Sequence, residues 1–219
     1  MKYYPVNLDI NDRDCLVVGG GKVGARKAET LARSGARVTV VSPDFDPALW
    51  DSCPTSLCLK RKAYQRKDLD GMFLVIGATD NRELNQTIAN DARERRVLFN
   101  GADLPEQSNF IVPAVVSRGD LTIAVSTSGN SPAFARKIKQ DLEQQFGPEY
   151  QAFLFLMGRI RTRLLAQGHA PDEHKQIFRE LINGELFDLV KKNDCEQIDH
   201  LLVERLGKEY RNFFQRGNQ

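Results

Sequence analysis

The fold of this chain is decided by one stretch near its N-terminus, Arg13-Asp14-Cys15-Leu16-Val17-Val18-Gly19-Gly20-Gly21-Lys22-Val23-Gly24. The segment Arg13–Val18 is a compact apolar run that ends in glycines, which predicts a buried strand. The segment Lys22–Ser34 then repeats apolar residues at helical spacing and stops before Gly35, a residue typical of the position after a helix. A strand, a glycine turn and a helix are therefore expected to follow one another directly.

The glycines of this turn match the pattern G-x-G-x-x-G at Gly19, Gly21 and Gly24. Between a strand and a helix, the pattern indicates a dinucleotide site: one glycine makes the tight turn, one lets the backbone approach a pyrophosphate, and one lets the helix pack on the strand. The helix N-terminus adds N–H groups and partial positive charge for the phosphates. We expect a nicotinamide dinucleotide there; a turn without a ligand is the simpler alternative. The expected contacts are Gly19, Gly21, Lys22, Val23 and Gly24.

The choice between NAD and NADP depends on the end of the second predicted strand, Arg37–Val41. Folds that select NAD usually place Asp or Glu there to bind the ribose hydroxyls. Here Ser42 follows the strand, and Asp44 lies a little beyond the expected place. Neither position 42 nor position 43 holds an arginine that could bind a 2′-phosphate. We therefore expect NAD, with Ser42 among its contacts, as a preference rather than a deduction.

A parallel sheet is predicted for the first hundred residues, because strand-like and helix-like patterns alternate along them. Their apolar runs are continuous rather than alternating, which indicates strands covered on both faces. We predict an α/β, Rossmann-like parallel sheet with helices on both faces. Its expected strands are Arg13–Val18, Arg37–Val41, Thr55–Leu59, Met72–Ala78 and Val97–Asn100, and its expected helices are Lys22–Ser34 and Asn81–Arg95.

The pattern changes near residue 109. Two strand-like segments, Asn109–Ser117 and Leu121–Thr127, flank Arg118-Gly119-Asp120 and predict an antiparallel hairpin. Ser131-Pro132 then opens a helix to about residue 146, with serine at the N-cap and proline at the first helical position.

Everything from Glu149 onward has a helical pattern, with breaks expected near Gly168, Gly184 and Gly207. We therefore predict three parts: a dinucleotide-binding domain at residues 1–112, a small α+β segment at 113–147, and an all-helical C-terminal domain at 148–219.

The composition excludes some function classes. The 31 basic and 29 acidic residues give a formal net charge of +2, so we expect no nucleic-acid partner. No apolar stretch approaches the length of a membrane span, and the first residues contain no signal-peptide core. We therefore expect a cytoplasmic protein that contacts no membrane.

No metal site is expected. Cys53 and Cys58 have no second Cys or His pair that would complete a zinc site. Cys15 falls in a predicted strand and Cys195 in a predicted helix, as is usual in a reducing compartment. Histidine occurs three times, all without ligand spacing, and we expect these side chains on helix surfaces: His169, His174 and His200.

Polar residues follow two of the predicted strands, at the edge where ligands bind in such folds. Thr79 and Asp80 come after one strand and are candidates for cofactor binding, although capping of the next helix explains them equally well. Asp103 comes after the other strand, and an ordinary turn aspartate is its simpler explanation.

Four segments together resemble the precorrin-2 dehydrogenases, including the N-terminal part of bifunctional sirohaem synthases. They occur in the family's order and cover about residues 1–145. They are Val17–Lys27, Gly77-Ala78-Thr79-Asp80, Asn100-Gly101-Ala102-Asp103 with Phe110–Ala114, and Ala124–Arg136. The combination is far more specific than a glycine loop alone.

The resemblance implies NAD-dependent oxidation of precorrin-2 to sirohydrochlorin, on the route to sirohaem or a cobalt corrinoid. It implies a catalytic role for Asp103 and a homodimer joined through residues 113–147. Two departures stand out: Ser128 occupies a position where the family commonly has glycine, and Gly101-Ala102 replaces a usual pair of valines. Beyond Gly147 only the helical character matches.

The substrate implied by the resemblance bears eight carboxylates and needs hydrogen-bond donors. A carboxylate cradle is predicted around the N-terminus of the helix that Ser131-Pro132 opens. A capped helix with solvated basic residues and no ligand explains these residues equally well. Lys137, Arg118 and one of Arg159, Arg161 or Arg163 are further candidates. The cradle consists of Ser126, Thr127, Ser128, Asn130, Ser131 and Arg136.

Two alternative functions stay open. The first is a bifunctional enzyme that also inserts iron into sirohydrochlorin, with Asp103 assisting pyrrole deprotonation. The second is a binding module that senses NAD without turnover, which needs neither an acid–base group at Asp103 nor an anion cradle at 126–131.

Overall fold

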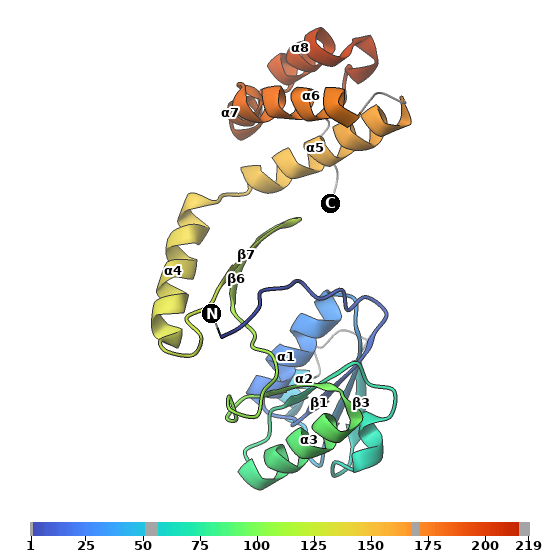
Figure 1. The fold of residues 1–219 in the computed structure, drawn as a ribbon, viewed down its shortest axis with the longest axis vertical. Helices are drawn as coiled ribbons and strands as arrows, with labels where there is room; N and C mark the ends of the chain where they lie inside the picture. Colours follow the sequence, from blue (N-terminus) through green and yellow to red (C-terminus); the bar gives the residue numbers. More distant parts are fainter. Residues whose placement is uncertain (1, 51–56, 168–170, 215–219) are drawn as a thin grey trace. The chain divides into compact units, whose positions relative to one another are not determined.

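The computed structural model describes residues 2–50, 57–167 and 171–214, without the side chains of 171–173. It forms two compact units, Met1–Val112 and Pro113–Gln219 (Figure 1). Cys53, Thr55 and His169 lie outside the described residues. No helix in the described part of the chain is long and apolar enough to cross a membrane.

The first unit is built on a five-stranded parallel sheet with the order β3-β2-β1-β4-β5. The prediction of a Rossmann-like parallel sheet is confirmed. The strands are β1 (Asp14–Val18), β2 (Arg37–Ser42), β3 (Leu57–Arg61), β4 (Leu74–Gly77) and β5 (Leu98–Gly101). The helices are α1 (Lys22–Arg33), α2 (Pro47–Trp50), the 3₁₀ turn η1 (Arg66–Leu69) and α3 (Arg82–Arg95).

Both faces of the sheet are covered, because successive side chains of a strand point to opposite faces. On β1, Cys15 and Val17 pack in one core with Ala28 and Leu31 of α1. Leu16 and Val18 pack in a second core with helix α3, through its residues Ile88, Ala89 and Ala92. The four β1 residues are almost inaccessible to solvent, which is the physical reason for their continuous hydrophobicity.

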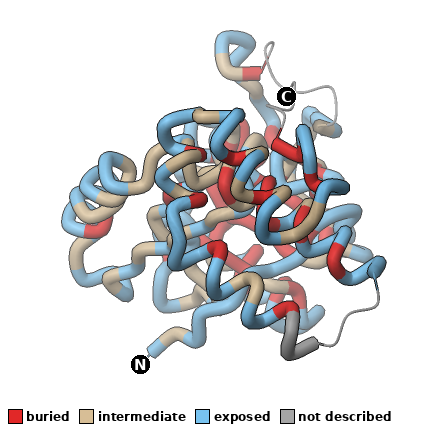
Figure 2. The backbone as a smooth tube through the Cα atoms, turned by 90° about the horizontal axis from the view of Figure 1, so that it is seen from above, coloured by how far each residue is buried: buried red, intermediate tan, exposed pale blue. Residues whose placement is uncertain are grey.

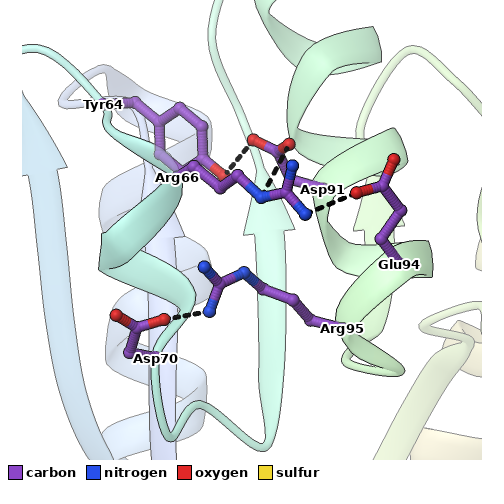
Figure 3. A network of polar contacts seen from close by, with 6 residues as sticks. All are labelled: Tyr64, Arg66, Asp70, Asp91, Glu94 and Arg95. Atoms are coloured by element: carbon purple, nitrogen blue, oxygen red, sulfur yellow. Dashed lines mark hydrogen bonds and ion pairs between the residues drawn. The ribbon is translucent and has the colours of Figure 1, made fainter.

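Polar contacts fasten the segment around η1 to helix α3 (Figure 3). The Tyr64 hydroxyl donates to Asp91 at 3.0 Å, and burial together with this bond raises the pKa of the Tyr64 phenol. Arg66 forms ion pairs with Asp91 and Glu94. Arg95 at the end of α3 pairs with Asp70. These contacts hold α3 in place, and α3 carries a residue of the candidate site.

The second unit begins with an antiparallel hairpin of β6 (Ala114–Arg118) and β7 (Leu121–Val125). Helix α4 (Pro132–Gln145) follows, and the Ser131 side chain accepts a hydrogen bond from the Phe134 N–H at 3.3 Å, as an N-cap does. The predicted first strand, Asn109–Ser117, begins too early. Asn109 instead bonds to Phe99 of β5 through its backbone N–H and through its side-chain oxygen.

The remainder of the second unit is helical: α5 (Glu149–Ala166), α6 (Pro171–Asn183), α7 (Leu186–Lys192), α8 (Cys195–Leu206) and the 3₁₀ turn η2 (Lys208–Tyr210). Large apolar residues of α5, α7 and α8 share one core with Tyr210. The break between α7 and α8 was not predicted. Asn193 makes it by adopting a left-handed conformation with φ of 56°, and Asp194 then caps α8.

Candidate functional site

The carboxyl ends of all five strands of the first unit lie at one edge of the sheet, because the strands are parallel. Between β1 and β4 the chain order reverses, and α1 and α3 leave toward opposite faces. Ligands of open α/β sheets bind in the crevice at such a point. The glycine loop follows β1, and the segments that carry Thr79 and Asp103 follow β4 and β5.

The glycines of the loop differ in what surrounds them. A β-carbon on Gly24 would lie 2.0 Å from the carbonyl oxygen of Gly19, so Gly24 lets α1 pack closely. Gly19 has a φ of +122° and no room beside the Ala78 carbonyl. Gly21, the N-cap of α1, has no atom within 4 Å of an added β-carbon. The open space at Gly21 is where a phosphate group fits against the helix N-terminus.

Trp50 fixes the position of this loop. Its indole Nε1–H donates a buried hydrogen bond of 2.7 Å to the Gly20 carbonyl, and its side chain is only 5% exposed. The Phe45 ring packs against it edge-on, with the ring centroids 5.3 Å apart. Trp50, the last residue of α2, was not predicted as part of the site, since a single aromatic residue gives no sign of its partner in the sequence.

The end of β2 lies beside the same loop. Ser42 is buried, and its hydroxyl oxygen would lie 2.8 Å from a β-carbon on Gly20. Asp44 extends into solvent, with 95% of its side chain exposed, and its carboxylate lies 3.7 Å from the guanidinium of Arg61 on β3. An exposed carboxylate and a cation thus stand together where the adenine ribose of a dinucleotide is bound in this fold.

Thr79 and Asp103 are brought together by Asn85, a residue that was not predicted from the sequence. Asn85 of α3 is fully buried, and its amide Nδ2 donates to Asp103 Oδ1 and to the Thr79 carbonyl, each at 2.8 Å. Capping of α3 falls to Asn81, which accepts from the Leu84 N–H at 2.9 Å, so the capping role considered for Thr79 and Asp80 is wrong.

The predicted carboxylate cradle belongs to the second unit, between β7 and α4. Its side-chain oxygens accept local backbone N–H groups: Ser126 from Ser128 at 3.1 Å, and Thr127 from Ser131 at 3.2 Å. Ser128 has a φ of 54°, a conformation that favours glycine by about 1–2 kcal/mol. Asn130 and Arg136 are exposed.

Comparison with known proteins connects these features. Residues 6–114 match a family described as putative NAD(P)-binding, and residues 118–145 match the sirohaem biosynthesis protein central family. The chain is 33% identical over 211 residues to a sirohaem synthase of Citrobacter koseri, covering 95% of this chain and 46% of that protein. It is 33% identical to a sirohaem synthase of Photobacterium profundum, covering 90% of this chain and 43% of that protein.

Among solved structures, SirC, a precorrin-2 dehydrogenase, has a TM-score of 0.72 and 28% identity, covering 90% of this chain and all of that one. This chain belongs to the precorrin-2 dehydrogenase and sirohaem synthase N-terminal-domain family. It spans less than half the length of the curated sirohaem synthases that it matches.

In this family member, two basic residues considered for substrate binding have local structural contacts. Arg118 donates to the carbonyls of Phe146 and Glu143 at 2.8 and 3.0 Å and so closes the end of α4. Arg159 donates to the Phe213 carbonyl at 2.6 Å and lies over the Phe213 ring.

Arg163 lies over the Tyr210 ring. Arg161, the third candidate on α5, lines a cavity of about 940 Å³ between α5 and α6. His174 also lines this cavity and is buried, so its expected place on a helix surface is wrong. His200 is exposed and lies 3.9 Å from Glu204. Among the residues with described side chains, no three His, Cys, Asp or Glu residues group as a metal site would require.

Proposed function

We propose that this chain oxidises precorrin-2 to sirohydrochlorin with NAD as the hydride acceptor. The observation that carries the proposal is the exposed carboxylate of Asp103, held at the same edge of the sheet as the open glycine loop. The likeness to SirC, which is named a precorrin-2 dehydrogenase and is covered over its whole length, supports the same substrate.

The residues at the edge of the sheet fit a dinucleotide. We propose that the loop from Gly19 to Gly24 binds the pyrophosphate, with Lys22 and Val23 contributing at the first turn of α1, and that Ser42 contacts the adenine ribose. Thr79 and Asp80 would flank the nicotinamide half. When bound, NAD supplies the hydride acceptor, and the protein supplies orientation and electrostatics.

Asp103 is the residue proposed to handle the proton. Oxidation of precorrin-2 transfers a hydride to NAD and releases a proton, so a base beside the macrocycle that accepts the proton completes the reaction. The Asp103 carboxylate is exposed at the end of β5 and held on one oxygen by Asn85. A positioned base of this kind contributes about 10²- to 10⁴-fold in rate.

Selection of NAD is proposed to rest on Asp44. Its exposed carboxylate repels a 2′-phosphate and is available to the ribose hydroxyls. Arg61 lies close enough to neutralise part of this charge. The Asp44→Asn variant should therefore bind NAD less tightly and lose discrimination against NADP, whereas Asp46→Asn, a similar change in the same loop, should alter neither affinity.

A homodimer joined through residues 113–147 is also proposed. The two-stranded sheet of β6 and β7 leaves unpaired strand edges, which proteins usually cover. Figure 2 shows exposed and partly exposed residues along most of α4: Ala135 is its one buried residue, and Phe134 is 58% exposed. A second copy would cover these surfaces, with the serine-rich loop beside α4 contributing to the substrate site. A monomer in light scattering at micromolar concentration would contradict this assembly.

The deciding experiment is anaerobic incubation of the chain with precorrin-2 and NAD, followed by the absorbance of NADH. Wild type should form NADH in proportion to sirohydrochlorin. Asp103→Asn should bind NAD normally and lose most turnover, whereas Glu106→Gln, an exposed carboxylate in the same loop, should match wild type. NAD binding without any turnover would favour a sensing module, and added ferrous iron tests chelation in the same sample.

A further inference from the structure

Asn85 is a polar side chain in a fully buried position on the first turn of α3. Both the amide nitrogen and the carbonyl oxygen of its side chain form hydrogen bonds with residues that follow β4 and β5. Its Nδ2 donates to Asp103 Oδ1 and to the Thr79 carbonyl, and its Oδ1 accepts from the Thr79 hydroxyl at 2.7 Å. One carboxamide therefore joins the loop after β4 to the loop after β5.

The backbone leaves room for this carboxamide. Gly77, the last residue of β4, has no β-carbon, and one built there would lie 3.3 Å from Asn85 Oδ1 and 3.2 Å from the Phe99 ring. Burying an amide costs free energy unless it is fully hydrogen-bonded. An apolar residue would fill the same space without that requirement. We therefore explain the asparagine at this buried position by its hydrogen bonds to Thr79 and Asp103.

We infer that Asn85 is a positioning residue that sets the Asp103 carboxylate for proton transfer, an inference that rests on the proposed function. The bond to Oδ1 fixes the plane of the carboxylate and leaves Oδ2 as the oxygen that accepts the substrate proton. The bonds to Thr79 tie the same amide to the loop that follows β4. The two strand-end loops thus keep a fixed distance.

The substitution Asn85→Asp tests this role selectively. It keeps an oxygen that accepts from the Thr79 hydroxyl, but it replaces the group that donates to Asp103 and to the Thr79 carbonyl by a second negative charge. We expect the melting temperature to fall, kcat to fall roughly 10- to 100-fold because the carboxylate is displaced, and the Kd for NAD to change less than about threefold, well below the cost of a lost binding contact. The matched control is Asn90→Asp, the same change at an exposed position of α3, which should behave as wild type.

The double variant Asn85→Asp with Asp103→Asn exchanges donor and acceptor across the same contact. A carboxamide at 103 donates to a carboxylate at 85, so the melting temperature should recover toward that of wild type. Turnover should remain at the level of Asp103→Asn alone, because the carboxylate no longer faces substrate. This recovery reports the contact between residues 85 and 103, because a loss caused only by the missing bond to the Thr79 carbonyl would not depend on residue 103.

If Asn85→Asp does not fold, Asn85→Ser provides the same comparison without a buried charge. It should lower kcat in the wild-type background and have little further effect when Asp103→Asn is already present. Three results would overturn the inference. The first is that the losses of kcat caused by the Asn85 and Asp103 substitutions are additive, and the second is that either Asn85 variant turns over within about threefold of wild type, less than ~1 kcal/mol in barrier height. The third is that the double variant is no more stable than Asn85→Asp. Wild type that fails to oxidise precorrin-2 would refute the proposed function alone, while the stability comparison still reports the contact.

Discussion

Replacing Gly21 by aspartate should abolish tight binding of NAD and leave the fold intact. The residue is the N-cap of α1, with φ of −81°, and no atom lies within 4 Å of an added β-carbon. Aspartate is among the preferred residues at an N-cap, where its side chain satisfies free N–H groups. The ligand-free variant should therefore be at least as stable as wild type.

The loss of affinity follows from charge. A carboxylate at Gly21 would occupy the space proposed for the pyrophosphate. At a separation of about 5 Å and an effective dielectric constant of about 20, two unit charges repel by ~3 kcal/mol. That corresponds to a loss of roughly 100-fold or more in Kd. The new side chain would also bond to the α1 N–H groups that bind the phosphates, which adds to the loss.

Isothermal titration calorimetry with NAD measures this effect directly. Trp50 provides a second signal, because it is the only tryptophan in the chain and bonds to the glycine loop. Gly21→Asn is the matched control, with nearly the same shape and no charge. If Gly21→Asp bound NAD within about threefold of Gly21→Asn, a difference below ~1 kcal/mol, the pyrophosphate would not lie at this helix N-terminus.

Three further predictions concern the same unit. Gly24→Ala should lower the free energy of unfolding by about 1–3 kcal/mol, measured by urea denaturation, because its β-carbon would meet the Gly19 carbonyl at 2.0 Å. Trp50→Phe removes a buried hydrogen bond to the glycine loop, so it should cost about 1–3 kcal/mol and weaken NAD binding in calorimetry. Burial raises the pKa of the Cys15 thiol to about 11. Iodoacetamide near pH 8 should therefore modify the exposed Cys58 and spare Cys15 until urea unfolds the protein. Equal labelling rates of the two cysteines would contradict the buried position of Cys15 in β1.

The sequence was sufficient to predict most elements of the first unit, because the inner strands β1 and β4 are buried on both faces and so form unbroken apolar runs. Strand β3, at the edge of the sheet, is largely exposed. Arg13–Val18 was predicted and β1 spans Asp14–Val18. The helix predicted at Asn81–Arg95 is α3, Arg82–Arg95. Periodicity is informative where a single physical cause, burial, governs every residue of an element.

The errors occur where a polar side chain, rather than burial, determines the backbone. Asn109 bonds to Phe99 at the outer edge of β5, so residues before Ala114 do not join the hairpin. Asn193 ends α7 without glycine or proline. Asparagine tolerates the left-handed conformation, but it does so too seldom for its presence to predict a break.

Some residues of the candidate site could be predicted from the sequence and others could not. Its glycines were visible because backbone geometry restricts the residue type, but the pattern does not say which glycine approaches a ligand. The structure separates them: Gly19 and Gly24 are enclosed by backbone, while Gly21 faces open space. Trp50 and Asn85 were not identified, because each acts on the site through a partner distant in the sequence, Gly20 for Trp50 and Asp103 for Asn85.

These two residues suggest how the site keeps its geometry. In this fold the reactive groups lie on loops at the ends of strands, which are the least constrained parts of the sheet. Here each loop is tied from the side by a buried donor, the indole N–H of Trp50 at Gly20 and the amide of Asn85 at Asp103. Both donors reside on elements anchored in a hydrophobic core. A hydride acceptor and a proton acceptor must be aligned to within a fraction of an ångström, and two buried donors provide that alignment without closing the edge of the sheet to substrate.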